Sequence, residues 1–172
     1  MRRITLWWMG AALLFDCSAA SAHGARCTVW RSKVDPSLSL QGRAIAELPS
    51  DRDAVAAIAC LLESRGDTRP ARFSGAMDER VSQTFDRATI EVAALYFISF
   101  IYEKKWDHGM AVAIDGPDGV NTDKTIRDAY AAYRRWFVKV KRYGIADCRK
   151  RGIAPLRGTS LAWYGKAPLP MP

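Results

Sequence analysis

The fold is decided by the stretch VAALYFISFIY at residues 92–102, which contains no charged side chain. A helix built from such a run is apolar on every side, so it belongs at the centre of a domain. The run is too short for a membrane-spanning helix, which needs roughly 18 to 20 apolar residues. We therefore predict a buried central helix over about residues 86–104, with the remaining elements packed around it.

A first helix is predicted ahead of the central one. It starts after Ser50, which can cap it, continues with apolar residues at helical spacing over 55–62, and ends at Gly66. Residues 67–84 follow no periodic pattern, which predicts a long loop of the kind that often carries function. Residues 23–49 contain scattered proline and glycine and predict an irregular arm.

Further helices are predicted after the central one. The expected elements are, in order, a short helix over 108–114, a turn at 115–119, a helix over 123–143, a brief helix ending at 151, and an extended tail over 153–172. Asn121 or Thr122 can cap the helix over 123–143. Leu161, Trp163 and Tyr164 are expected to fold back and anchor the tail. The pattern predicts one all-α domain of four to five helices.

The N-terminus has the pattern of a secretory signal peptide. Arg2 and Arg3 precede an apolar run over 4–15, and small residues follow up to Ala22. We predict cleavage after Ala22, which assigns residues 1–22 to the signal and 23–172 to a periplasmic or secreted domain. No transmembrane segment is expected in the mature chain.

Three cysteines remain after this cleavage: Cys27, Cys60 and Cys148. An odd number in an oxidising compartment indicates one disulfide and one spare thiol. We favour a bridge between Cys27 and Cys60, because it would tie down the mature N-terminus. The sequence leaves the connectivity open.

The positive charge is concentrated in one segment. The chain has a net charge of +8 and a pI near 9.6, and residues 134–157 contain nine basic side chains against the single acid Asp147. The rest of the mature chain is therefore close to neutral. Because export separates the protein from nucleic acid, we expect an anionic protein or envelope surface as the partner and no nucleic acid.

The predicted binding surface is one helix face. Arg135, Lys139 and Arg142 recur at helical spacing on the side opposite the aromatic stripe, and Arg149 and Lys150 extend the charge beyond it. The competing interpretation is a solvated basic face that only aids solubility.

Catalytic and metal-binding motifs are weak. The general acid or base candidates are His108, Glu63, Glu91 and Glu103, and each has an ordinary structural explanation. Cleavage would make His23 the N-terminal residue, whose amine and imidazole could chelate copper, but its place beside the cleavage site is explained as incidental. The oxygen-bearing residues Asp115, Asp118, Asn121 and Asp123 miss the spacing of a calcium loop and predict a turn and helix cap. We expect neither a metal nor a cofactor.

The sequence therefore favours an exported, non-catalytic binding protein, such as an inhibitor or immunity-type protein, that engages an acidic protein through its basic helix face. One alternative is a small cell-wall hydrolase that uses Glu91 or His108. Another is a structural protein associated with the envelope. The oligomeric state stays open.

Overall fold

The computed structural model describes residues 50–71, 88–104 and 111–166. The described elements are α3 (Asp51–Leu61), the 3-10 helix η1 (Leu62–Ser64), α5 (Ile90–Glu103), β1 (Ile114–Asp115), α6 (Asp123–Tyr143), α7 (Ile145–Lys150) and β2 (Ala162–Trp163). Helices dominate, and the two short strands form a single antiparallel pair. The predicted all-α fold is confirmed.

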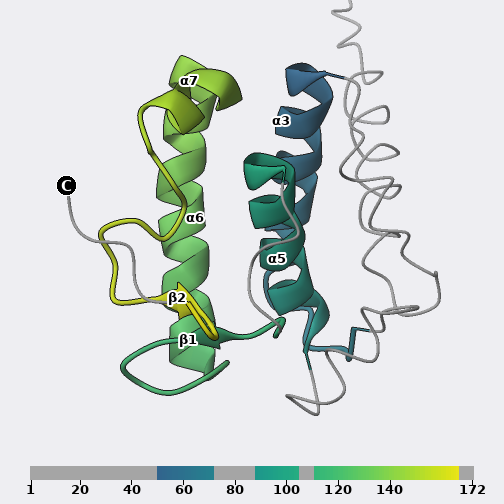
Figure 1. Cartoon of the computed structure of the whole chain (residues 1–172). Helices are drawn as coiled ribbons and strands as arrows, with labels where there is room; N and C mark the ends of the chain where they lie inside the picture. Colours follow the sequence, from purple (N-terminus) through teal and green to yellow (C-terminus); the bar gives the residue numbers. More distant parts are fainter. Residues whose placement is uncertain (1–49, 72–87, 105–110, 167–172) are drawn as a thin grey trace, which may run out of the picture.

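The central helix is α5, as the apolar run predicts. Thirteen of its 14 residues are buried, and it packs against both α3 and α6 (Figure 1). It begins at Ile90, later than predicted, because the preceding backbone pairs with the chain that follows η1: Ala71 N donates to Ala88 O at 2.7 Å and Ile90 N to Arg69 O at 2.9 Å. It ends at Glu103, where Lys104 takes the left-handed conformation with φ 55°.

The longest of the described helices, α6, has the predicted bounds. The Thr122 side chain caps it by accepting from Thr125 N at 3.2 Å, and Gly144 ends it with φ 83°. Its inner side carries aromatic residues that pack on α5, and Tyr130 donates its hydroxyl to Glu91 O at 3.0 Å. Strands β1 and β2 lie beside its first turns, whereas α7 follows its last turn (Figure 1).

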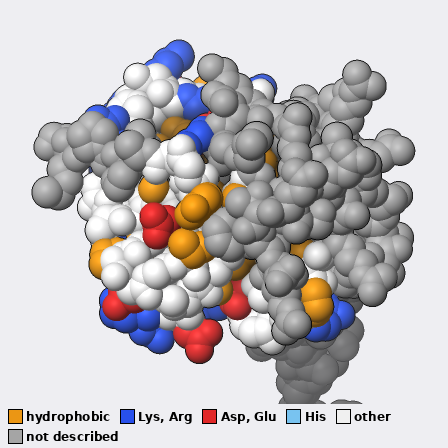
Figure 2. Space-filling view, turned by 60° about the horizontal axis from the view of Figure 1, so that its bottom comes forward, with side chains coloured by type: hydrophobic (Ala, Val, Ile, Leu, Met, Phe, Trp, Pro, Cys, Tyr) orange, Lys and Arg blue, Asp and Glu red, His pale blue; other side chains and the backbone are white. Residues whose placement is uncertain are grey.

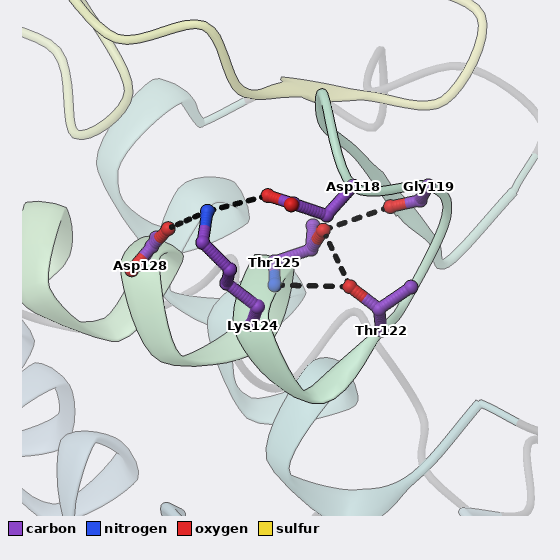
Figure 3. A network of polar contacts seen from close by, with 6 residues as sticks. All are labelled: Asp118, Gly119, Thr122, Lys124, Thr125 and Asp128. Atoms are coloured by element: carbon purple, nitrogen blue, oxygen red, sulfur yellow. Dashed lines mark hydrogen bonds and ion pairs between the residues drawn. The ribbon is translucent and has the colours of Figure 1, made fainter.

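A polar network surrounds the start of α6 (Figure 3). Besides the cap, the Thr125 hydroxyl donates to Gly119 O at 2.8 Å. Lys124 lies between two carboxylates, 2.5 Å from Asp118 and 3.3 Å from Asp128. The helix cap is therefore Thr122, and of the oxygen-bearing residues of this turn Asp118 forms an ion pair with Lys124.

The predicted helix over 108–114 is wrong in its described part. Residues 111–113 are not helical, and Ile114 and Asp115 form β1, in which Ile114 pairs with Trp163. Asn121 supports this arrangement, because its side-chain oxygen accepts from Ile114 N at 2.8 Å. A partner strand almost 50 residues further along the chain overrides the local helical pattern.

The tail returns along α6 and is fixed at Ile153. Its carbonyl oxygen accepts two hydrogen bonds, from the Tyr102 hydroxyl at 2.7 Å and from Trp136 Nε1 at 3.0 Å. Leu161 and Trp163 anchor the tail as predicted, since both are 5% exposed, whereas the Tyr164 side chain is 40% exposed.

Several predictions fall outside the described residues: the signal peptide, the arm, both histidines, Cys27 and most of the 67–84 loop. Cys60 is buried in α3, and its pairing with Cys27 stays a prediction. Cys148 is a buried free thiol. Within the described ranges, no helix is both long and apolar enough to cross a membrane.

Candidate anion-binding site

Three cations meet at a surface hollow between the second half of α6 and the returning chain. The hollow has a volume of about 140 Å³, and we call it the basic hollow. Arg135 and Lys139 line it from α6, and Arg157 lines it from the loop that follows Pro155. Its remaining lining residues are Ala132, Trp136, Ile153, Ala154, Pro155, Gly158 and Thr159.

Local structure explains how each cation arrives there. Arg135 and Lys139 are one helical turn apart, so they occupy the same side of α6. Arg157 lies in a turn in which its backbone N–H donates to Ala154 O at 3.3 Å. Its side chain is oriented by a 2.6 Å hydrogen bond from Nη1 to Gly152 O. Tyr102 and Trp136 hold the neighbouring Ile153 carbonyl, which fixes this loop against α6.

No acidic residue lines the basic hollow. In the described part of the chain, Arg135 and Lys139 form no ion pair, whereas the Lys and Arg side chains that do form them lie elsewhere, as Lys124 does. On the face drawn in Figure 2, Lys and Arg lie beside Asp and Glu at the lower edge, and Lys and Arg predominate at the upper edge. The hollow therefore has a positive potential with no internal counter-charge.

The geometry suits an anionic group. A guanidinium offers several N–H donors in one plane and binds a carboxylate or phosphate through two parallel bonds, while an ammonium contributes a point charge. Partial enclosure strengthens such contacts relative to an open surface, because it lowers the effective dielectric constant. Two arginines and one lysine around a hollow of this size can hold one carboxylate or one phosphate group.

The remaining predicted binding residues lie outside the basic hollow. Arg142 is exposed, with its guanidinium 5.1 Å from the centre of the Tyr143 ring. Lys150 forms an exposed ion pair with Asp147 at 3.9 Å. Arg149 has a different place altogether, because it is turned towards the last turn of α5.

Arg149 acts as a structural residue. Its Nε donates to Tyr102 O, its Nη2 donates to Ile101 O at 3.5 Å, and its guanidinium lies over the Tyr102 ring. It thereby satisfies carbonyl groups that the end of a helix leaves without intrahelical partners. The fold brings together Arg135, Lys139 and Arg157, of which the sequence prediction placed only the first two in the site.

The described catalytic candidates have structural surroundings. Glu91 is 7% exposed, and its Oε2 accepts from Gly66 N at 2.8 Å, so it ties α5 to the turn after η1. Glu63 and Glu103 are exposed at helix ends. Burial raises the pKa of the Cys148 thiol, which disfavours the thiolate that nucleophilic attack requires. Among the described residues, no cluster of His, Cys, Asp and Glu could hold a metal ion.

No protein family, curated protein or solved structure matches this chain.

Proposed function

We propose that the protein is an exported, non-catalytic binding protein that engages an acidic protein partner through the basic hollow. Its action would be that of an inhibitor or immunity-type protein, which covers a partner's acidic surface. The convergence of Arg135, Lys139 and Arg157 on one hollow without an acidic lining residue carries this proposal. Export, with cleavage after Ala22, would place the interaction in the periplasm or outside the cell.

Charge distribution supports a defined site over diffuse attraction. The exposed cations Arg134, Lys141 and Arg142 lie on the same half of α6 but outside the basic hollow. They contribute long-range steering of an anionic partner. The hollow adds short-range, oriented contacts, which determine how long a complex lasts.

The Glu91 environment weighs against the hydrolase alternative. A general acid must reach its substrate, whereas this buried carboxylate is already engaged with a backbone N–H of its own fold. The basic hollow contains no carboxylate that could take its place.

The test compares two triple variants that remove the same charge. Arg135→Gln/Lys139→Gln/Arg157→Gln neutralises the basic hollow, and Arg134→Gln/Lys141→Gln/Arg142→Gln neutralises cations around it. Binding of the mature protein to an immobilised acidic peptide rich in Asp and Glu is measured at low and at physiological ionic strength. We expect the hollow variant to lose at least about tenfold in affinity, and the control about threefold or less. Circular dichroism confirms that both variants fold.

Equal losses in the two variants would contradict a defined site and leave only general electrostatic attraction. Independence of salt would contradict a charge-driven contact, since exposed charges are screened over about 8 Å at physiological ionic strength. Hydrolysis of purified cell wall by the wild-type protein would contradict the non-catalytic assignment.

A further inference from the structure

A second hollow lies on the other side of the returning chain. It has a volume of about 160 Å³, and Ala154 and Pro155 line both hollows. Its walls are mainly apolar, with contributions from Leu156, Leu161 and Ala162. Three uncharged residues with polar hydrogens also line it, Ser99 of α5, Tyr133 of α6 and Trp163 of β2. We call it the hydroxyl pocket.

These three residues form one hydrogen-bonded group. Trp163 Nε1 donates to Ser99 Oγ at 3.2 Å, and the hydroxyls of Ser99 and Tyr133 share a hydrogen bond. All three residues are at least 95% buried. In the described part of the chain, neither hydroxyl makes another hydrogen bond.

This group has more hydrogen-bond donors than acceptor oxygens. The group has three polar hydrogens, on the indole, the serine and the tyrosine, and only two oxygen acceptors. If Tyr133 donates to Ser99, the serine hydrogen is left over; if Ser99 donates to Tyr133, the tyrosine hydrogen is. One buried O–H thus lacks an acceptor in either arrangement, and such a group is costly to leave unpaired.

The Tyr133 hydroxyl stays protonated at physiological pH. Burial raises the pKa of Tyr133 well above its ordinary value of 10.0. The spare hydrogen therefore persists under working conditions, and an acceptor oxygen in the pocket can pair with it.

The charged residues of the pocket do not select for a net charge on a ligand. Glu103 and Lys166 line it and carry opposite charges, so the pocket as a whole favours neither an anion nor a cation. A volume of about 160 Å³ matches a ligand of the size of a single six-membered ring, since a cavity of about 150 Å³ holds benzene.

We propose that the hydroxyl pocket is a second binding site, for a small uncharged molecule with a compact apolar body and one hydrogen-bond acceptor oxygen, such as a ketone. The apolar walls cover the body of the ligand, and the spare hydroxyl of Ser99 or Tyr133 donates to its oxygen. The site is separate from the basic hollow and does not depend on the function proposed for it.

Two probes of nearly equal size test the proposal. Cyclohexanone carries an acceptor oxygen where methylcyclohexane carries a methyl group. Each is titrated into the mature protein, and the indole N–H resonance of Trp163, assigned with Trp163→Phe, is followed by NMR. We expect a saturable shift with cyclohexanone and about threefold to tenfold weaker binding of methylcyclohexane, which corresponds to one hydrogen bond.

Variants locate the donor. Either Ser99→Ala or Tyr133→Phe alone leaves one spare hydroxyl hydrogen, so the preference for cyclohexanone should persist in each. The double variant Ser99→Ala/Tyr133→Phe removes both hydroxyls and should bind the two probes equally. Tyr130→Phe is the matched control, because it removes a buried tyrosine hydroxyl that donates to Glu91 O away from the pocket.

Three results would overturn the proposal. They are the absence of a saturable shift with cyclohexanone, equal affinity of the wild type for both probes, and a preference that survives in the double variant. If the double variant does not fold, Ala162→Leu replaces it: the larger side chain fills the pocket, so cyclohexanone binding should be lost, and retained binding rejects the site. The acidic-peptide test of the basic hollow gives an independent result, because the polar and charged side chains of the two sites are different.

Discussion

The two halves of α6 differ in whether their basic side chains have acidic neighbours. In the first half, Lys124 is held between Asp118 and Asp128, so basic and acidic side chains neutralise each other locally (Figure 3). In the second half, Arg135 and Lys139 face a hollow without an acidic lining residue.

This difference shows that the cations of the second half are held in place by the buried side of the helix. Trp136 packs edge-on against Tyr102 with ring centres 4.9 Å apart and donates to Ile153 O. These contacts hold the loop that supplies Arg157. Mutual repulsion among the cations is therefore opposed by buried aromatic packing, and the missing negative charge must come from solution or from a partner.

The largest expected effect comes from removing that packing. Trp136→Ala should lower the free energy of unfolding by about 3 to 5 kcal/mol, because a buried aromatic side chain and its hydrogen bond are lost. Val138→Ala is the control on the same half, since Val138 is 61% exposed and should change stability by less than about 0.5 kcal/mol. Urea unfolding monitored by circular dichroism measures both. Equal effects would show that the second half is not anchored by its inner side.

Alkaline pH should weaken the same anchor. Burial raises the pKa of Tyr102 from 10.0 to about 12. As the pH rises, Tyr102 loses its proton in the unfolded chain before it does so in the folded protein. Its contribution to the stability of the fold is therefore complete below pH 10 and is lost as the pH rises towards 12. We expect this residue to contribute about 1.5 kcal/mol to the free energy of unfolding below pH 10. This is less than the pKa shift alone would give, because the hydroxyl is only partly buried.

Tyr102→Phe separates this contribution from the rest. Urea unfolding at a series of pH values from 8 to about 12 should show a shallower decline for the variant than for the wild type. Tyr130 and Tyr133 also have raised pKa values and should maintain part of the decline. Parallel curves for the variant and the wild type would show that Tyr102 does not contribute.

Removal of the N-terminal cap of α6 should lower the stability of the fold moderately. Thr122→Ala deletes the side chain that accepts from Thr125 N, at an expected cost of about 1 kcal/mol. Thr122→Ser retains the hydroxyl and should stay close to the wild type. Urea unfolding of both variants provides the measurement, and an equal loss in the two would attribute the effect to the methyl group.

The smallest effect is expected for the exposed ion pairs of the first half. Hydrogen bonds to Asp118 and Asp128 raise the pKa of Lys124 above 10.5. Lys124→Met should destabilise only slightly, because exposed pairs contribute little. The difference should be complete below pH 10.5 and disappear as the pH rises through the raised pKa. A difference that persists at higher pH would indicate a packing contribution.

Local signals predicted the helices well. The cap at Thr122 and the stop at Gly144 gave α6 its observed bounds, and the uncharged run gave the central helix. The helix over 108–114 was wrong because its described end pairs with residues 162–163, a contact that no local pattern reveals. The site was predicted in part: Arg135 and Lys139 follow from helical spacing, whereas Arg149 satisfies carbonyls at the end of α5.

The sequence by itself determined the all-α class, the central helix and the concentration of positive charge near residues 134–157, because these depend on composition and on periodicity within single segments. Only the tertiary structure decided which cations share a hollow and which hydroxyls share a pocket. Arg157 lines the same hollow as Arg135 and Lys139, and Trp163 donates to Ser99, because the returning chain brings together side chains that are distant in sequence.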